Sequence, residues 1–273
     1  MKRSTLFKSF KKIPFSLPLP LIPLFALGFL LTHYHIPFRD LLSFEFYQNL
    51  ANPAVRMIYV QEGWRKEQVA ESVGNKLGWD DEEKAEFLNA HIALGKETSE
   101  GFYFPQNYMI MKDAEPEEVS KLMISTYDKK TSQIKKGKTS QILNEDTALI
   151  VASIIQREAG GKSDMRLISG IIWNRIFAGM KLQMDATLQY AKGDEDLWWP
   201  QVKSEDKFII SPYNTYKNKS LPPTAIANPG LAALEAAYNP QKTSCMFYLH
   251  DKKRRIHCAK TYEEHKKNIE KYL

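Results

Sequence analysis

The chain has 273 residues and a net charge of +6, with 43% hydrophobic, 12% aromatic and 26% charged residues. This composition excludes an intrinsically disordered chain, because the aromatic side chains supply enough apolar surface for a packed core. A basic balance of this size fits nucleic acid, an anionic membrane or an acidic polymer as partner. Since no basic helix and no stripe of basic and aromatic residues occurs, we exclude nucleic acid.

The N-terminus has the composition of a membrane anchor. Five basic residues fall within the first twelve positions, and residues 13–31 carry no charge. A helix of that length approaches the thickness of a hydrocarbon core, about 30 Å. Because basic residues stay on the cytoplasmic side, we expect a cytoplasmic tail and a single-pass anchor over 1–33, with the remainder outside the cytoplasmic membrane. The alternative is a cleaved signal peptide, although no small-residue cleavage site follows Leu31.

Residues 34–53 are expected to form a connector, and residues 54–143 a small subdomain with its connection to the rest. Lysine and serine residues over 129–140 favour a polar helix followed by a loop. A boundary near residue 143 would then separate this part from a second subdomain over 144–273. The fold class predicted for the whole chain is α+β.

The subdomain over 54–143 begins with an alternating run at 55–60 that predicts a strand. Residues 64–77 have the apolar spacing of an amphipathic helix, and Gly78 is well placed as its C-cap. Asp80 could cap a second helix over 81–94. The predicted order is strand, helix, helix.

The second subdomain, 144–273, is predicted to be mostly helical with one β-hairpin. The predicted elements are helices over 144–159, 164–178, 231–238 and 262–273, and hairpin strands over 245–249 and 256–259. Residues 191–230 are rich in aromatic residues and proline and lack a clear period. Such a long irregular segment is typical of a functional loop.

The two cysteines, Cys245 and Cys258, flank the predicted hairpin turn. A register in which they face each other would permit a disulfide, and two buried thiols are the alternative. Three histidines, His250, His257 and His265, lie nearby. No spacing among these residues resembles a zinc motif, and neighbouring strand residues point to opposite faces, so we predict no metal site.

Glu158 is the strongest candidate for chemistry. On a helix it shares one face with Val151, Ile154 and Ile155. A carboxyl group on such an apolar face loses hydration, so its pKa should rise, which suits a general acid near neutral pH. The alternative is a solvated glutamate at a helix end, or one paired with an arginine, either Arg166 or Arg175.

Several ordered blocks of the sequence resemble the YceG-like (MltG) family of membrane-bound endolytic murein transglycosylases. They are EGFYFPQNY at 100–108, ASIIQREA at 152–159, IWNR at 172–175 with GMKLQMD at 179–185, SPYNTY at 211–216, and LPPTAIANPG at 221–230. The pair at 247–248 and His265 fit the closing pattern. The resemblance covers the chain from about Val55 to its end, and several blocks in order are more specific than one short motif.

The resemblance implies that Glu158 is the catalytic residue. Many relatives have a second glutamate where this chain has Gln156. The implied reaction cleaves glycan strands between MurNAc and GlcNAc without water. Glu158 would protonate the leaving oxygen and then accept the proton of the muramic acid C6 hydroxyl, which leaves a 1,6-anhydro end. The resemblance also implies a LysM-like first subdomain and no cofactor.

Other departures from the family pattern affect substrate contacts and leave the reaction class untouched. They are Gln106, Asn107, Met184, Ala186 and Thr224.

Five residues are candidates for lining a glycan groove, because amides, phenols and carboxylates bind sugar hydroxyl and acetamido groups. They are Gln183, Asp185, Tyr213, Asn214 and Asn228. For Asp185 the alternative is an N-cap of the following helical segment, and for Tyr213 and Tyr216 it is core packing. Trp198 and Trp199 could form a rim of the groove or simply pack.

The expected partners are peptidoglycan glycan strands, the cytoplasmic membrane and peptidoglycan synthases. The resemblance further implies that the protein limits the length of nascent glycan strands. A non-catalytic glycan-binding or assembly protein is the main alternative, and a hydrolytic muramidase with a second carboxylate near Glu158 is another.

Overall fold

The computed structural model describes residues 43–137 and 143–273. The chain divides into two compact units, residues 1–48 and residues 49–273. The expected anchor over 1–33 lies outside the described residues. In the part that is described, no helix has the length and hydropathy needed to cross a membrane. The first described element is helix α2, Phe44–Ala51, within the expected connector.

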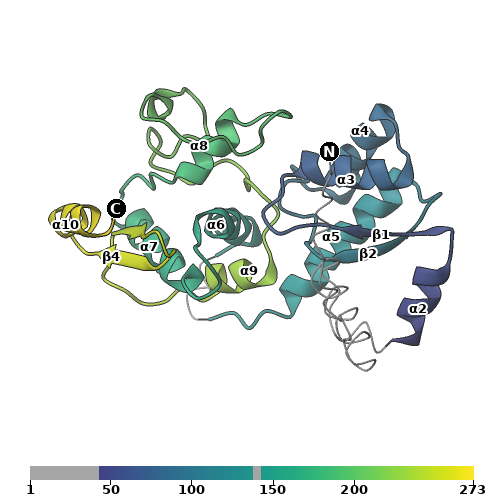
Figure 1. The fold of residues 1–273 in the computed structure, drawn as a ribbon, viewed down its shortest axis with the longest axis horizontal. Helices are drawn as coiled ribbons and strands as arrows, with labels where there is room; N and C mark the ends of the chain where they lie inside the picture. The colour runs from purple at the N-terminus through teal and green to yellow at the C-terminus, as the bar shows by residue number, and fades with distance from the viewer. Residues whose placement is uncertain (1–42, 138–142) are drawn as a thin grey trace, which may run out of the picture. The chain divides into compact units, whose positions relative to one another are not determined.

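The first half of the larger unit contains a small antiparallel sheet with helices beside it (Figure 1). Its elements are β1 (Val55–Tyr59), α3 (Lys66–Leu77), α4 (Asp81–Asn89), the 3₁₀ helix η2 (Ala90–Leu94), β2 (Asn107–Met111) and α5 (Pro116–Ser132). Strand β1 pairs with β2 from Val55 opposite Met111 to Tyr59 opposite Asn107. The predicted first strand and first helix are therefore confirmed.

Strand β2 was absent from the strand-helix-helix order predicted from the sequence. Its side chains alternate, with Tyr108 and Ile110 buried between more exposed neighbours. The run is short and follows a proline, so its period of two is visible over few positions. The polar helix expected from residue 129 is the C-terminal end of the longer helix α5.

Local capping explains where the first helices end. Gly78 has a φ of 84°, which a residue with a side chain rarely adopts, and it ends α3 as predicted. Asp80 accepts a hydrogen bond from the Glu83 amide at 3.0 Å and caps α4 as predicted. The helix that was expected to continue to residue 94 instead changes from an α-helix to the 3₁₀ helix η2 after Asn89. The Leu88 carbonyl accepts the His91 ring nitrogen and the Ser99 hydroxyl, which compete for the oxygen that the next α-helical turn would use.

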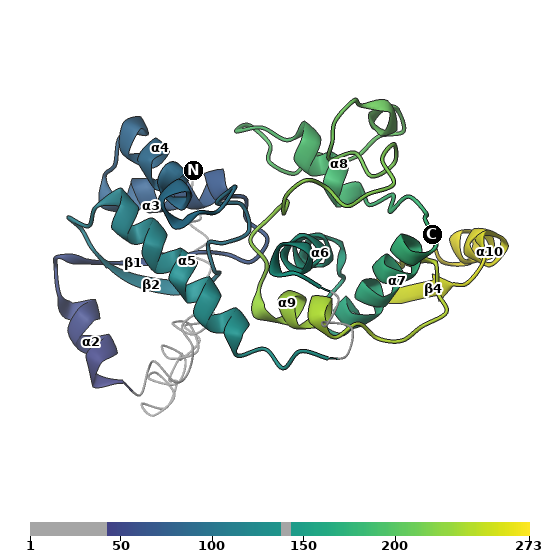
Figure 2. The ribbon, with the colours of Figure 1, turned by 180° about the vertical axis from the view of Figure 1, so that it is seen from behind.

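The second half of the unit is mostly helical and contains a β-hairpin before its last helix, as predicted. Its elements are α6 (Glu145–Glu158), α7 (Met165–Phe177), α8 (Asp185–Lys192), the 3₁₀ helix η4 (Glu205–Phe208), α9 (Leu231–Tyr238), β3 (Phe247–His250), β4 (Ile256–Ala259) and α10 (Tyr262–Tyr272). Helix α6 lies between α7, α8 and α9 in both views (Figures 1 and 2) and contacts all three. This central place explains why one stripe of α6 is fully buried.

One hydrophobic core includes residues from both halves, among them Ile58 and Tyr103 in the first and Ile154 and Ile226 in the second. Each fully buried side chain of this size contributes roughly 1.5–3 kcal/mol to folding relative to an exposed one. The boundary expected near residue 143 adjoins positions 138–142, which lie outside the described residues, and it stays a prediction.

Cys245 and Cys258 form a disulfide with a Cα–Cα distance of 5.8 Å. The register that we expected is wrong, because Tyr248 is the residue opposite Cys258. Cys245 lies before β3 begins, so the bridge ties the incoming chain to β4 rather than joining two facing strand residues.

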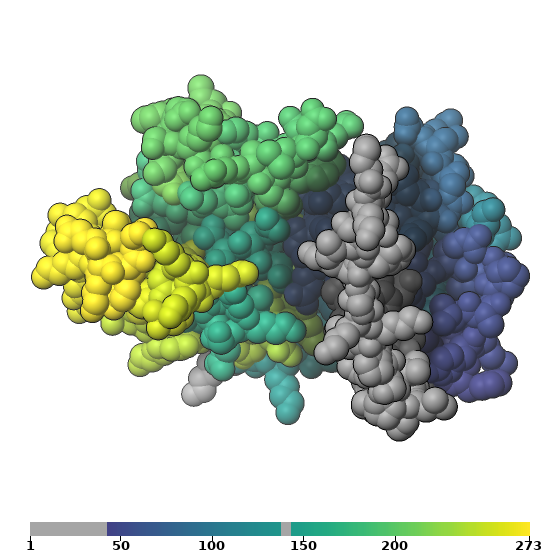
Figure 3. All heavy atoms as spheres, in the orientation of Figure 1, coloured from purple at the N-terminus to yellow at the C-terminus, as the bar shows by residue number. Residues whose placement is uncertain are grey.

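The irregular segment after α8 forms the surface above α6 in the space-filling view (green in Figure 3). Its two tryptophans pack against cations, with the Arg65 guanidinium 5.0 Å from the Trp198 ring centre and that of Arg157 3.8 Å from the Trp199 ring centre. The Trp199 indole also donates to Gln68 of α3 at 3.3 Å. These contacts fit the packing alternative for both tryptophans.

Candidate active site

Helix α6 ends at Glu158 because the following turn has its own fixed hydrogen bonds. The Asp164 carboxylate accepts the Gly160 amide at 3.0 Å and the Gly161 amide at 3.2 Å. It also contacts the His250 ring at 2.7 Å, which ties the turn to strand β3. Asp164 occupies the N-cap position of α7, but its side chain makes no cap bond to that helix. The turn therefore holds the end of α6 against the hairpin.

The Glu158 carboxyl group accepts two hydrogen bonds from different elements. The Ala186 amide, in the first turn of α8, donates to Oε1 at 3.0 Å. The Tyr248 hydroxyl, on β3, donates to Oε2 at 2.7 Å. A carboxyl group at a helix N-terminus also faces the positive end of the helix dipole. Among the described residues Glu158 forms no ion pair, so the expected alternative of pairing with Arg166 or Arg175 is not seen.

The pKa of Glu158 is raised above its ordinary value, chiefly because burial disfavours the charged form. The neighbouring charge of Asp185 raises the pKa further. The amide of Ala186, the hydroxyl of Tyr248 and the nearby His250 act in the opposite direction. The net direction matches the prediction from the apolar stripe on α6. A carboxyl group with a raised pKa can donate a proton near neutral pH.

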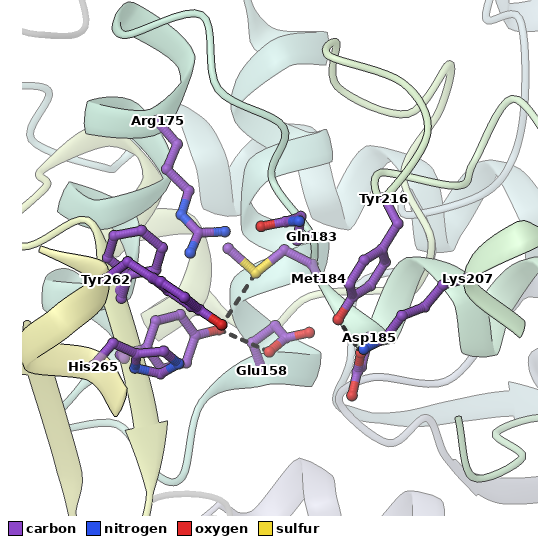
Figure 4. Close-up of a pocket in the computed structure, with 11 residues that line it drawn as sticks. Glu158, Arg175, Gln183, Met184, Asp185, Lys207, Tyr216, Tyr262 and His265 are labelled. Atoms are coloured by element: carbon purple, nitrogen blue, oxygen red, sulfur yellow. Dashed lines mark hydrogen bonds between the residues drawn. The ribbon is translucent and has the colours of Figure 1, made fainter. Parts of the chain in front are cut away.

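Glu158 lines a pocket of about 340 Å³. The lining comes from α6, α7, α8, η4, the following loop and the C-terminal hairpin and helix (Figure 4). The remaining lining residues are Arg175, Gln183, Met184, Asp185, Lys207, Tyr216, Phe247, Tyr248, Tyr262 and His265. Such a concave site beside a perturbed acid is where ligands are expected to bind.

Two of the predicted groove residues, Gln183 and Asp185, lie at this pocket. Gln183 has a φ of 52°, a left-handed conformation that costs a residue with a side chain about 1–3 kcal/mol and is often found at functional sites. Asp185 is the first residue of α8 and makes no cap bond, so the N-cap alternative is wrong. Its carboxylate instead accepts the Tyr216 hydroxyl at 2.6 Å.

The other three predicted groove residues do not line this pocket. The amide of Asn214 is fully buried and donates to the carbonyls of Lys207 and Ile209, which shapes the loop that carries Lys207. Asn228 is also fully buried; its side chain accepts the Tyr103 amide at 2.8 Å and donates to a backbone carbonyl of the first half. Tyr213 bonds Thr224 at 2.8 Å and packs on a neighbouring tyrosine ring.

From the sequence, Arg175 was expected only as an alternative ion-pair partner of Glu158, and no role was expected for Lys207 or Tyr248, although all three line the pocket. Tyr248 belongs to the closing pattern that was matched, and Arg175 to another matched block, but neither pattern indicates that its side chain lines a pocket. Lys207 lies in an irregular segment without a periodic signal. Within residues 43–137 and 143–273, no group of three or more histidine, cysteine or acidic residues could hold a metal ion.

Comparison with known proteins adds to this geometry. The model of the YceG-like family matches residues 36–271. A curated protein named endolytic murein transglycosylase, from Bacillus subtilis strain 168, is 37% identical over 183 residues, which cover 65% of this chain and 49% of that protein. A protein of the same name from Streptococcus pneumoniae strain D39 is 26% identical over 253 residues, 81% of this chain and 45% of that protein.

A crystal structure is also similar. It is a yceG-like protein, lmo1499, from Listeria monocytogenes, with a TM-score of 0.70 and 27% identity, and the match covers 80% of this chain and 76% of that chain. The present chain spans about half the length of the curated relatives that it matches, 49% and 45%.

Proposed function

Because the chain belongs to the YceG-like family, we propose that it is an endolytic murein transglycosylase, a lyase that cleaves glycan strands between MurNAc and GlcNAc and leaves 1,6-anhydro-MurNAc ends. The observation that carries the proposal is Glu158, which lies in a pocket, has a raised pKa and is held by donors from α8 and β3. The names of the curated relatives supply the reaction type.

One carboxyl group suffices for both proton transfers. Protonated Glu158 donates its proton to the glycosidic oxygen as the bond from that oxygen to the MurNAc anomeric carbon breaks. The new carboxylate then accepts the proton of the C6 hydroxyl, and the C6 oxygen bonds to the same anomeric carbon. The attack is intramolecular, so it needs no bound water and gains from proximity. Glu158 is protonated again at the end.

A hydrolytic muramidase is the chemical alternative, since Asp185 lines the same pocket. A hydrolase would use a second carboxylate to activate water or attack the sugar. Asp185 accepts the Tyr216 hydroxyl and is exposed, which suits a contact to substrate hydroxyl groups. We therefore propose a substrate-positioning role for Asp185 and keep both proton transfers on Glu158.

The substitution Glu158→Gln tests the catalytic role. Glutamine can accept the Ala186 amide through its carbonyl oxygen and donate its NH2 group to the Tyr248 oxygen, but it cannot transfer a proton, so the rate should fall by about 10²-fold or more while the melting temperature stays close to that of the parent. Asp185→Asn is the matched control within the pocket and should lose less activity. A Glu158→Gln variant that cleaves sacculi at nearly the parental rate would refute the assignment.

We further propose that residues 54–143 contain a LysM-like, glycan-binding subdomain. Its support is the order β1, α3, α4, β2, with the two strands paired antiparallel. If disruption of this subdomain left glycan binding intact while deletion of another part of the chain abolished it, the assignment would be contradicted.

Localisation is proposed from the N-terminal sequence, as a single-pass cytoplasmic membrane protein with the N-terminus inside and the active site outside. This position would bring the enzyme to nascent strands, whose length it would limit alongside peptidoglycan synthases. A reporter that is active only outside the cytoplasm, fused after Leu273, should be active. A mature N-terminus near residue 33 would contradict the retained anchor.

A further inference from the structure

Arg175 is a buried cation at the wall of the pocket. Its side chain extends from α7 toward Met184 and Glu158 (Figure 4), and the residue is 6% exposed. Nε donates to the Met246 carbonyl at 2.6 Å, and Nη1 donates to the Leu182 carbonyl. These bonds fix the guanidinium, and among the described residues no carboxylate forms an ion pair with it.

A buried charge without a counter-ion is costly, because the interior solvates it poorly. The similarly buried Arg65, 8% exposed, shows the usual solution, since its Nε lies 3.4 Å from a Glu67 oxygen. The two tyrosines near Arg175 cannot serve as its counter-ion. Burial raises the pKa of Tyr216 and of Tyr248, which keeps both hydroxyl groups neutral. Glu158 is also neutral when it is ready to act as an acid.

Within the reaction, Glu158 carries the charge that would balance Arg175 only after it has donated its proton, so within the described part of the chain Arg175 has no counter-ion when the substrate binds. Cleavage of a glycosidic bond develops positive charge on the sugar, which a nearby guanidinium opposes. A negative group on the bound substrate would remove that conflict and supply the missing counter-ion.

Lys207 is a second cation at the same pocket. Its side chain comes from η4, is exposed, and lies with Nζ 5.0 Å from the ring centre of Tyr216. In the part of the chain that the structure describes, it too has no ion-pair partner. Asp185 is the other carboxylate among the lining residues, which also include the two cations Arg175 and Lys207.

We propose that Arg175 and Lys207, on different sides of the pocket, bind carboxylates of the glycan strand, so that the site selects acidic murein over a neutral polymer of amino sugars. The inference rests on the proposed function and adds the charge of the substrate to it. Two sources share this chemistry in murein, the lactyl group of muramic acid where the peptide stem has been removed, and the carboxylates of the stem itself. A planar guanidinium and an ammonium group are both suited to such a ligand.

The test measures binding, so that it does not depend on cleavage. Full-length protein with Glu158→Gln is titrated with native strands and with strands whose carboxylates have been converted to amides. Native strands should bind on the order of tenfold more tightly, or more, because a charge-assisted hydrogen bond is lost with each amidated group. Strands with intact stems and strands freed of stems are titrated separately, and the source is the one whose amidation weakens binding.

Two added substitutions assign the effect to these side chains. Lys207→Gln should reduce the preference for native strands, whereas Lys203→Gln, an exposed lysine on the same loop outside the pocket, should leave it unchanged. Arg175→Gln should reduce the preference further, provided its melting temperature shows that it folds; if it does not fold, Lys207→Gln and the amidated strands decide. Equal affinity for native and amidated strands of both kinds would overturn the proposal, as would an unchanged preference in Lys207→Gln. If the protein binds native strands more tightly than amidated ones but the parent protein cleaves neither, the proposed function is refuted and the proposed carboxylate binding is not.

Discussion

Replacing Tyr248 with phenylalanine removes one of the two hydrogen bonds to Glu158 and should move the pH dependence of the enzyme. The Tyr248 hydroxyl donates to Oε2 at 2.7 Å and lowers the pKa of Glu158, against the upward effect of burial. A hydrogen bond to a charged acceptor contributes about 1.5–3 kcal/mol and one to a neutral acceptor about 0.5–1.5 kcal/mol. The difference, about 1–1.5 kcal/mol, corresponds to about one pKa unit.

The direction in which the pH profile moves follows from the role of Glu158 as an acid. The donor favours the ionised carboxylate, so its loss raises the pKa and keeps Glu158 protonated to higher pH. The alkaline limb of kcat/KM on purified glycan strands should therefore move upward by about one unit in Tyr248→Phe, with a lower maximum because the carboxyl group is less firmly held. Tyr262→Phe is the control, since that side chain lines the pocket without a bond to Glu158. An alkaline limb that stays in place in Tyr248→Phe would refute this account of the carboxyl group.

Three further predictions concern stability. Removing the bridge with Cys245→Ser and Cys258→Ser should lower the unfolding free energy by about 2–4 kcal/mol, measured by urea denaturation, and equal thiol titration of the denatured parent with and without reductant would show that no bridge exists. Burial raises the pKa of Glu100 to about 8, so its ionisation should cost stability as pH rises from about 4.5 through 8; Glu100→Gln should flatten this decline in thermal unfolding, and an equal decline in both proteins would argue against it. Gly101→Ala should lower the melting temperature, because the residue has a φ of 91° and an added Cβ would lie 2.8 Å from the Cβ of Ala225; an unchanged melting temperature would contradict that packing.

Sequence patterns predicted the elements whose signals are local. The period of α6, its cap at Asn144 and the glycines after Glu158 all lie within one short stretch, and the helix was found within a residue or two of its observed bounds. Strand β2 was missed because its partner β1 lies some fifty residues earlier in the chain. Alternation of buried and exposed positions over only five residues also gives a weak periodic signal.

The candidate site was predicted at its centre and only in part around it. Glu158 was identified from its place on the apolar face of its own helix and from the resemblance of the block around it to the family pattern, and both signals are local in the sequence. Asn214 and Asn228 were expected at the groove, but their amides bond to backbone groups instead. Asn214 fixes its own irregular loop, which has no periodic signal, and Asn228 bonds to a segment more than a hundred residues away. Tyr248 reaches Glu158 across a separation of ninety residues, which no local pattern encodes.

The most direct measurement of the central claim is the chemical identity of the ends that the enzyme creates. Full-length protein is incubated with purified sacculi, and the released fragments are analysed by mass. If Glu158 performs both proton transfers and the C6 hydroxyl is the acceptor, the new ends should be 1,6-anhydro-muramic acid, lighter than a reducing end by one water, and Glu158→Gln should yield none of them. New ends that consist of reducing muramic acid would show that water is the acceptor and would contradict the transglycosylase mechanism.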